Sequence, residues 1–461
     1  MTVRVAIGLF GMLLGVVGSA TAQEGTWRPL FDGGTLEGWL RLGGEAEYRV
    51  EDGAIVGVTK ARTPNTFLAT EAVYSDFVLE LEFRVDAELN SGVQVRSESR
   101  ADYRNGVVHG YQVEIDPTAR AWTAGIYDEQ RRGWLFPVEH DQRAQRALRH
   151  GDWNHLRVDC RGDVIRTWLN GVPVAYLVDG MTPRGFVALQ VHSVADELVG
   201  RQVRWRNIRL LELDATAAAE TNSAAVAGDF PLVVNLRPNT LTERERELGW
   251  RLLWDGRTTT GWRGAHRDAF PAQGWVVENG ELTVLESGGR EAGRGGDIVT
   301  VEELSAFELQ LELRLTEGAN SGIKYYVTES YDAAGGSAIG LEYQILDDER
   351  HPDAKLGRDG NRTLASLYDL VPASKEPRFV RPLGEWNHAR IVSRGDGSVE
   401  HWLNHRKVLA YDRGSTGFLE LVKTSKFKDW PGFGLWERGH LLLQDHGNRV
   451  SFRSIKVREL E

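Results

Sequence analysis

The chain has 461 residues, of which 41% are hydrophobic and 26% charged. This balance excludes an intrinsically disordered chain, and the length predicts two globular domains of around 200 residues each. The net charge of −11 disfavours nucleic acid and anionic membrane surfaces as partners, because both attract basic proteins.

The N-terminal segment has the pattern of a secretory signal peptide. Arg4 precedes an apolar run from Val5 to Val17, and small residues follow as far as Ala22. The alternative is a membrane anchor, but the run is shorter than the ~20 residues that a spanning helix needs. We therefore expect residues 1–22 to be cleaved and the mature chain, without a membrane anchor, to lie in the periplasm or outside the cell.

The remaining chain contains one sequence pattern twice, which predicts a tandem duplication. The distance between matching segments grows slowly along the chain, as expected when insertions fall in the loops of a shared scaffold. The matching segments are Leu30-Phe31-Asp32-Gly33 and Leu253-Trp254-Asp255-Gly256, Asn90-Ser91-Gly92 and Asn320-Ser321-Gly322, Tyr111-Gln112-Val113 and Tyr343-Gln344-Ile345, Trp153-Asn154-His155 and Trp386-Asn387-His388, and Trp168-Leu169-Asn170 and Trp402-Leu403-Asn404.

Within each copy, apolar residues alternate with polar ones. The runs 77–85 and 307–315 both show this period of two, which is typical of half-buried antiparallel strands. Many such short segments are separated by Gly, Asn and Asp turns, so the sequence predicts an all-β chain of two β-sandwich or jelly-roll domains. We place the first domain at 23–214, a flexible linker at 215–240 and the second domain at 241–461, opening with a short capped helix at Thr242.

Several motifs of the second copy resemble, in this order, the bacterial 3-keto-disaccharide hydrolase family, also described as a 3-keto-glucoside lyase/hydratase domain. They include Asn320-Ser321-Gly322-Ile323-Lys324-Tyr325, Glu342-Tyr343-Gln344-Ile345-Leu346-Asp347-Asp348, His351-Pro352-Asp353-Ala354-Lys355, Ser366-Leu367-Tyr368-Asp369, Ser425-Lys426-Phe427 and Leu443-Gln444-Asp445-His446-Gly447. The resemblance implies a concanavalin-like fold and a carbohydrate or 3-keto-glycoside substrate. It also implies cleavage by elimination and hydration.

The first copy departs from this pattern at positions that matter for the implied site. It has Gln94 and Arg96 where the second copy has Lys324 and Tyr326, and it lacks the His351-Pro352-Asp353-Ala354-Lys355 segment. Gln190-Val191-His192 stands in place of Gln444-Asp445-His446. We therefore expect the second copy to hold the active site and the first to be a binding or supporting domain.

Three strands of the second copy each present a polar pair. Because side chains alternate along a strand, Lys324 and Tyr326 share one face, as do Glu342 and Gln344, and as do Gln444 and His446. If the pairs line one concave sheet they form a sugar-sized groove. The alternative is that each pair simply faces water.

The charged loop 347–368 adds candidate groups beside these strands. We expect His351 to act as base or metal ligand, Lys324 or a bound cation to stabilise an enolate, and Tyr368 to protonate the leaving oxygen, with His446 as a further acid or base. The residues that we expect to bind the substrate are Tyr326, Glu342, Gln344, Arg362 and Gln444. Asp347 and Asp348 are candidate ligands of a divalent cation, although a solvated charged loop explains them equally well.

A noncatalytic carbohydrate-binding protein is the alternative function, since sandwich folds serve both purposes. The fifteen Trp residues are compatible with both an enzyme and a binding protein for carbohydrates, because an indole can stack on a sugar ring. Most of these Trp residues are nevertheless expected in the cores. A structural adhesion module would show flat polar faces without converging titratable groups. The sequence carries no signal for the oligomeric state.

Overall fold

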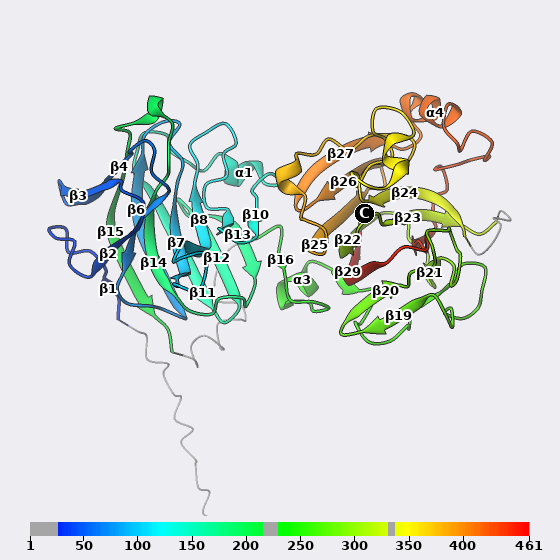
Figure 1. Ribbon diagram of the computed structural model, residues 1–461, viewed down its shortest axis with the longest axis horizontal. Helices are drawn as coiled ribbons and strands as arrows, with labels where there is room; N and C mark the ends of the chain where they lie inside the picture. The colour runs from blue at the N-terminus through cyan, green and yellow to red at the C-terminus, as the bar shows by residue number, and fades with distance from the viewer. Residues whose placement is uncertain (1–25, 215–228, 331–336, 461) are drawn as a thin grey trace, which may run out of the picture.

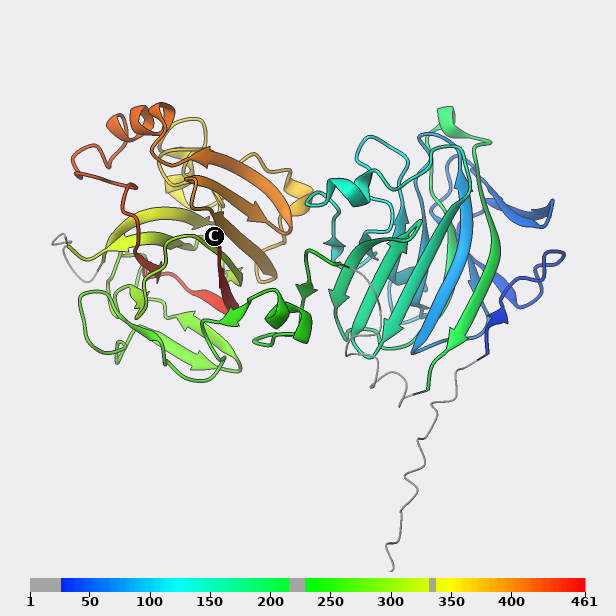
Figure 2. The same cartoon turned by 180° about the vertical axis from the view of Figure 1, so that it is seen from behind.

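The computed structural model describes residues 26–214, 229–330 and 337–460, so the expected signal peptide lies outside the described residues. Each half of the described chain is a sandwich of two sheets, and the two sandwiches lie side by side (Figures 1 and 2). The prediction of two tandem all-β sandwich domains is therefore confirmed.

The first domain packs a larger sheet against a smaller one. In spatial order, the larger sheet contains β16 (Val234–Asn235), β13 (Val172–Val178), β12 (Val164–Leu169), β11 (Asn154–Arg161), β6 (Phe77–Val85), β15 (Gln202–Glu212), β4 (Ala54–Val58) and β3 (Glu47–Glu51), with β1 (Arg28–Pro29) also paired to β15. The smaller sheet contains β10 (Gly133–Phe136), β9 (Ile126–Glu129), β8 (Val108–Ile115), β7 (Ser91–Ser99), β14 (Phe186–Val191), β5 (Thr66–Thr70) and β2 (Trp39–Gly43).

The second domain repeats this plan. Its larger sheet contains β19 (Trp275–Glu278), β20 (Glu281–Val284), β29 (Val450–Glu459), β22 (Phe307–Leu315), β25 (Trp386–Ser393), β26 (Ser398–Leu403) and β27 (Arg406–Asp412), with β17 (Arg251–Leu252) also paired to β29. Its smaller sheet contains β18 (Trp262–Gly264), β21 (Ile298–Thr300), β28 (His440–Leu443), β23 (Asn320–Thr328) and β24 (Ile339–Leu346).

The core of each domain lies between its two sheets. The apolar residues of β6 and β22, predicted from their alternation, are nearly fully buried there. The opposite face of β22 carries carboxylates that pair with arginines of the neighbouring strands. Glu308, for example, accepts a hydrogen bond from Arg390 at 2.6 Å and one from Arg458 at 2.7 Å. Oppositely charged cross-strand pairs of this kind favour the observed register.

Several repeated motifs hold equivalent turns in the two domains. The indole N–H of Trp39 donates to the carbonyl of Leu30 and that of Trp262 to the carbonyl of Leu253, both at 2.9 Å. In the second domain, Asn404 accepts from the backbone N–H of His388 at 2.8 Å and donates to Asn387 at 2.8 Å. Asn170 makes the equivalent bonds in the first domain. These motifs therefore maintain the scaffold.

The strand register corrects the sequence alignment of the two copies at one segment. Gly92 pairs with Glu114 and Gly322 pairs with Gln344, so Glu114 and not Gln112 occupies the place of Gln344. Gln112 in turn occupies the place of Glu342. The shared Tyr-Gln dipeptide had favoured a match displaced by two residues. Both domains thus carry a carboxyl and an amide on this strand, in opposite order.

A β-bulge in the strand after the Asn-Ser-Gly motif breaks the expected alternation. Tyr326 has a positive φ of 51°, and its side chain joins Tyr325 in the core. Its hydroxyl hydrogen-bonds to the carbonyl of Ser305 and to Ser393. Arg96 has the same backbone conformation, with φ 48°, and donates to the carbonyl of Ser75 at 2.6 Å. Tyr326 therefore anchors the bulge and does not lie on the face of Lys324.

The segment joining the domains is folded in its second half. Residues 215–228 lie outside the described residues, but Val234 and Asn235 pair in parallel with Leu177 and Val178 of β13. Phe230 is buried, with its ring 5.3 Å from that of Trp168. The first sheet is thus extended by residues that the sequence assigns to the linker.

The α-helices in the described residues are short, namely α1 (Gln142–Gln145), α3 (Glu243–Glu247) and α4 (Thr416–Lys423). The predicted cap of α3 is present, because Thr242 accepts from the N–H of Glu245 at 3.0 Å and the Glu245 carboxylate accepts from the N–H of Thr242 at 2.8 Å. No helix in the described part of the chain has the length and apolar character needed to cross a bilayer.

Candidate active site in the second domain

A cavity of about 400 Å³ opens on the outer face of the smaller sheet of the second domain. Ile323 and Tyr325 of β23 point into the core, so Lys324 between them points to this outer face. The cavity volume lies within the ~300–1,000 Å³ range of small-molecule sites. Its lining includes Lys324, Glu342, Gln444, Glu291, Ser337, Lys426 and Trp430.

Lys324 supplies a buried positive charge to the cavity. Its Nζ lies 3.4 Å from Oδ2 of Asp297 and 3.8 Å from Oε1 of Glu291, and it donates to the carbonyl of Ala338 at 3.2 Å. Burial disfavours the ammonium, but the neighbouring carboxylates, with Glu342 among them, outweigh this effect and raise the pKa of Lys324. The side chain is therefore cationic at neutral pH.

Glu342 lies directly opposite Lys324 on β24. Gly322 makes room for it, since a Cβ at that glycine would lie only 2.4 Å from Oε1 of Glu342. Among the described residues, the carboxyl of Glu342 has no hydrogen-bond partner although it is buried. Burial raises its pKa to about 7, and Lys324 and Lys426 limit the rise. Glu342 can thus exchange a proton near neutral pH.

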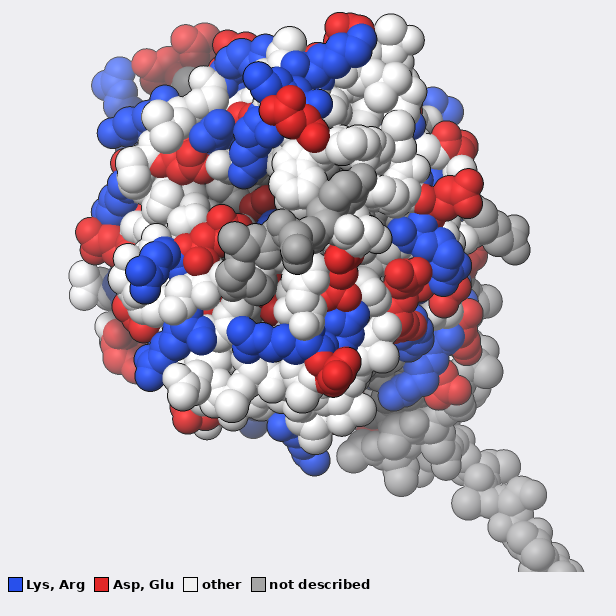
Figure 3. Space-filling view, turned by 90° about the vertical axis from the view of Figure 1, so that its right-hand side faces the viewer, with Lys and Arg blue, Asp and Glu red and all other residues white. Residues whose placement is uncertain are grey.

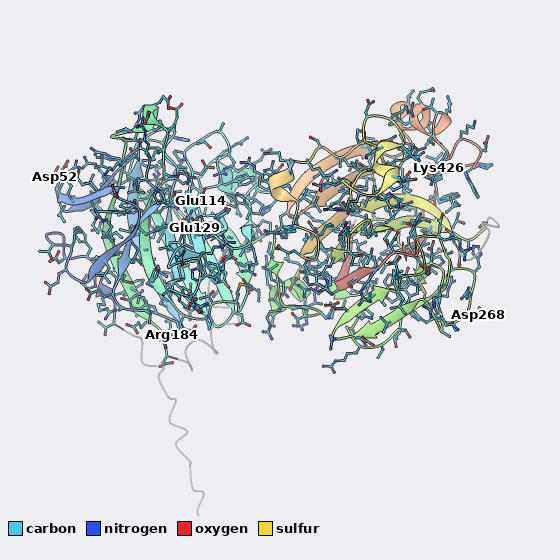
Figure 4. All side chains as sticks on the ribbon, viewed as in Figure 1. Asp52, Glu114, Glu129, Arg184, Asp268 and Lys426 are labelled. Carbon is cyan, nitrogen blue, oxygen red and sulfur yellow. The ribbon has the colours of Figure 1, made fainter. Side chains whose placement is uncertain are left out.

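Lys426 follows α4 and brings a second ammonium to the cavity. Its Nζ lies 4.1 Å from the ring centroid of Tyr368, a cation–π contact. The side chain is exposed, but partial desolvation by the surrounding protein, assisted by the charge of Lys324, lowers the pKa of Lys426. In Figure 4, Lys426 lies between α4 and the strands β23 and β24.

Tyr368 and Arg362 belong to one hydrogen-bonded cluster beside the cavity. The Tyr368 hydroxyl donates to Oδ2 of Asp353 at 2.8 Å, and Arg362 donates to Oδ1 of the same carboxylate at 2.9 Å. Arg362 also donates to Asp369 at 2.8 Å. Burial and the hydrogen bond to Asp353 raise the pKa of Tyr368, so the phenol stays protonated and its proton is directed to Asp353.

His351 and His446 face each other edge to face, with ring centroids 6.0 Å apart. Burial lowers the pKa of both imidazoles, so both are neutral near pH 7. Nδ1 of His351 accepts from the N–H of Asp353 at 3.2 Å, which leaves the ring proton on Nε2. His351 therefore offers a donor and not a lone pair. Nδ1 of His446 has no partner among the described residues.

The two glutamines of the expected set lie beside Glu342 and Lys324. Gln444 donates from Nε2 to Glu291 at 3.2 Å, and its buried Oε1 has no partner within the described part of the chain. Gln344 is 1% exposed, and its Oε1 accepts from the N–H of Ile345 at 3.2 Å. Gln444 is thus positioned to hydrogen-bond a ligand.

Asp347 and Asp348 have structural partners. Asp347 accepts from the N–H of Gly318 at 2.8 Å, and Asp348 accepts from the N–H of Leu364 at 2.7 Å and lies 3.0 Å from Nζ of Lys375. Among residues 26–214, 229–330 and 337–460, no group of three or more His, Cys, Asp or Glu side chains is arranged to hold a metal ion. These two carboxylates therefore do not fit a cation site as the structure places them.

The structure thus assembles most of the side chains expected from the sequence and adds others. Lys324, Glu342 and Gln444 line the cavity, with His351, His446, Arg362 and Tyr368 next to it, whereas Tyr326 is in the core. Lys426, Glu291 and Asp297 were missed. Lys426 stands in the Ser425-Lys426-Phe427 motif and could have been found there, while Glu291 and Asp297 lie in a glycine-rich loop without periodicity.

Charged side chains surround this end of the molecule without forming a patch of one sign. Figure 3 shows Lys and Arg interspersed with Asp and Glu over the exposed end of the second domain. Four charged side chains gather in the lining of the cavity: Lys324 and Glu342 are buried there, and Lys426 and Glu291 are exposed at its surface.

Comparison with known proteins places both domains in one family of sequences. The model of the 3-keto-alpha-glucoside-1,2-lyase-like domain matches the chain twice, over residues 26–211 and 249–458. A curated relative from Bacteroides thetaiotaomicron, named 3-keto-disaccharide hydrolase, is 40% identical over 233 residues, which are 46% of this chain and 79% of that protein.

Solved structures resemble about half of the chain at a time. A crystal structure from Parabacteroides distasonis, provisionally described as a glycosyl hydrolase, is 29% identical with a TM-score of 0.42, covering 49% of this chain and all of that one. A Bacillus subtilis protein of unknown function with a galectin-like fold is 11% identical with a TM-score of 0.31, covering 42% of this chain and 98% of its own.

Proposed function

Because this chain belongs to the family of 3-keto-alpha-glucoside-1,2-lyase-like domains, we propose that its second domain cleaves 3-keto-disaccharides by elimination and then hydrates the product. The observation that carries the proposal is the cross-strand pair of Lys324 and Glu342. It sets a buried ammonium beside a carboxyl whose pKa is about 7, in a cavity of sugar size.

The reaction needs a base, a stabilised enolate and a proton donor. In a 3-keto-glycoside the ketone acidifies the hydrogen on C2, and the glycosidic oxygen on C1 lies β to the carbonyl. The base takes the C2 proton, the electron pair forms an enolate, and the C1–O bond breaks as the leaving oxygen gains a proton. Water then adds to C1 while C2 regains a proton, so one water is consumed for each bond cleaved.

Glu342 is the base in this proposal. Partial burial makes this carboxylate more basic than a fully solvated one, and a pKa of about 7 leaves it partly ionised at neutral pH. The sequence pointed to His351 for this role. Because Nδ1 of His351 already accepts from Asp353, the lone pair of this imidazole is in use and Glu342 is the better candidate.

Lys324 and Lys426 stabilise the enolate oxygen. Lys324 is buried and Lys426, although exposed, lines the same cavity, where a fixed charge acts more strongly than it would in open water. Asp297 and Glu291 hold Lys324 in place and keep it charged. This assigns to the two lysines the role that a bound cation would otherwise fill.

The imidazole pair serves the leaving sugar. Nε2–H of His351 is a neutral donor, and His446 faces it edge to face. Together they can hydrogen-bond the glycosidic oxygen as negative charge develops on it. Tyr368 and Arg362 position this segment through Asp353, and Gln444 offers a free carbonyl oxygen to a sugar hydroxyl. We also propose that the protein acts outside the cytoplasm, as the sequence pattern of residues 1–22 predicts.

The test follows the C2 hydrogen. The purified protein is incubated with an enzymatically prepared 3-keto-disaccharide in D₂O, and the released sugars are analysed by NMR. We expect cleavage with deuterium at C2, no cleavage of the unoxidised disaccharide, and an unchanged rate with EDTA. Cleavage that retains the original C2 hydrogen would rule out elimination. Binding without cleavage would favour a noncatalytic carbohydrate-binding protein, and a rate lost with EDTA would remove the assignment of the enolate to the lysines.

A further inference from the structure

The outer face of the first domain's smaller sheet contains a second cavity, of about 360 Å³. It occupies the place equivalent to the active-site cavity, because Gln190 and Gln444 hold matching positions beside the Asn-Ser-Gly motifs. Ser91 donates to the carbonyl of Gln190 at 2.7 Å, and Ser321 donates to that of Gln444 at 2.8 Å. The two cavities are therefore duplicates whose side chains have diverged.

Gln190 is the feature that points to a ligand. Its side chain is fully buried, it lines the cavity, and neither its Oε1 nor its Nε2 has a partner among the described residues. Burying an unpaired amide is costly, so such groups ordinarily have a partner in protein, water or ligand. The hydroxyl groups of a sugar both donate and accept, which matches the two unpaired ends of this amide.

The rest of the lining suits an uncharged sugar. Trp134 and Tyr127 present half-buried rings, 5.3 Å apart between centroids, on which a pyranose can stack. Glu114 and Glu129 offer carboxyl oxygens, and Figure 4 shows them near each other in the first domain. Burial raises the pKa of both carboxyls, to about 7 for Glu114, and the two arginines of the lining are paired, Arg120 with Glu114 and Asp116 and Arg378 with Glu376, so the described lining of the cavity offers no free charge to a ligand.

The second domain closes the cavity. Arg378 and Phe379 contribute to its lining, although they belong to the second domain. Arg381 donates to the carbonyl of Trp134 at 2.9 Å, and the ring of Phe379 lies 6.1 Å from that of Trp122. The segment around Phe379 is thus held against the first domain by specific contacts.

The groups proposed for catalysis are missing from this cavity. Gln94 stands where the second domain has Lys324, and its amide donates to Gln112 at 2.7 Å. Glu114 accepts hydrogen bonds from Asn90 at 2.6 Å, from Gln112 at 2.9 Å and from Arg120 at 2.9 Å. Both oxygens of the Glu114 carboxyl are thus occupied by hydrogen bonds, and Gln94 brings no charge that could stabilise an enolate as Lys324 does.

From these contacts we propose that the first domain holds a noncatalytic binding site for one neutral pyranose unit, completed by Arg378 and Phe379 of the second domain. The sugar stacks on Trp134 or Tyr127 and pairs with the amide of Gln190. The proposal does not depend on the reaction assigned to the second domain, because it concerns binding alone.

The test measures maltose binding by calorimetry on the two-domain protein, with glucuronate as the charged comparison. A Gln444→Leu background isolates the first-domain site. We expect one maltose per chain in this background, at least tenfold weaker binding of glucuronate, and no measurable maltose binding after Gln190→Leu is added. Phe379→Ala should weaken maltose binding at least tenfold, since it removes the ring with which the second domain closes the cavity.

A thermal melt separates binding from folding. Because the Gln190 amide makes no hydrogen bond, Gln190→Leu should leave the melting temperature unchanged or raise it, and turnover of a 3-keto-disaccharide should stay at the wild-type rate. Unchanged maltose binding in the Gln190→Leu, Gln444→Leu double variant would overturn the proposal, as would a lowered melting temperature. If maltose binds as expected while no 3-keto-disaccharide is cleaved, only the function proposed for the second domain fails.

Discussion

Replacing Glu342 by Gln separates the cost of this carboxylate to folding from its use in catalysis. The amide keeps the shape of the side chain but cannot take a proton. As a general base contributes on the order of 10²–10⁴ in rate, turnover of a 3-keto-disaccharide should fall by that factor. In the wild type, kcat/KM should rise with pH through about 7, because only the ionised carboxylate can act.

The same substitution should stabilise the fold at alkaline pH. The pKa of Glu342 is raised from 4.5 to about 7, so the folded protein binds this proton more tightly than the unfolded chain does. Its contribution to stability therefore falls as pH rises between 4.5 and 7. At 1.36 kcal/mol per pKa unit the full loss is about 3 kcal/mol. Since Gln has no charge to bury, the variant should gain roughly 2–3 kcal/mol over wild type between pH 5 and pH 8.5.

Urea unfolding at several pH values, alongside turnover assays, measures both effects. Glu437→Gln, at an exposed position of the same domain, is the matched control and should change neither quantity. The reasoning is refuted if Glu342→Gln keeps wild-type turnover, or if its relative stability is the same at pH 5 and pH 8.5. The second result would mean that the carboxyl is solvated and is not the buried group described.

Three further substitutions test the neighbouring groups. Lys426→Met should lower kcat by on the order of 10² while leaving the melting temperature equal or higher, since the lowered pKa of Lys426 means that the fold disfavours its charged form; unchanged kcat would exclude this lysine from the reaction. His446→Ala should lower turnover about a hundredfold and His192→Ala much less, as steady-state rates will show; equal losses would contradict a site in the second domain. Tyr326→Phe should cost about 1–2 kcal/mol in urea unfolding, because it removes the bonds to Ser305 and Ser393, with turnover within about twofold of wild type; lost turnover without lost stability would return this tyrosine to the site.

The fold could be predicted from local patterns, since alternation in β6 and β22 and the repeated Trp and Asn motifs all reflect short-range geometry. The alternation rule failed at Tyr326 because its own positive φ inserts a bulge that directs its side chain to the core beside Tyr325. The sequence of the strand does not indicate that the bulge falls at Tyr326. The alignment of the two copies was displaced by two residues at Gln112, because it matched the identical Tyr-Gln dipeptides. The true strand register is visible only in the cross-strand pairing.

The candidate site was predictable where it lies on strands. Lys324 and Glu342 were expected to line one groove, and they do so because residues directly opposite each other on paired strands point to the same face of the sheet. Lys426 and Asp297 come from loops far apart in the chain, and their approach to Lys324 depends on how α4 and the glycine-rich segment fold over the sheet. The role that we propose for His351 differs from the one expected from the sequence because its tautomer depends on a backbone N–H that the sequence does not locate.

The parallel strand β16 has a consequence for how the protein is made. Val234 and Asn235 complete the edge of the first domain, and Phe230 packs against Trp168, so this domain cannot complete its fold without residues beyond 214. An expression boundary drawn at residue 214 would leave β13 as an exposed edge strand, and exposed edges recruit other chains. A first domain produced alone should therefore extend at least to Asn235.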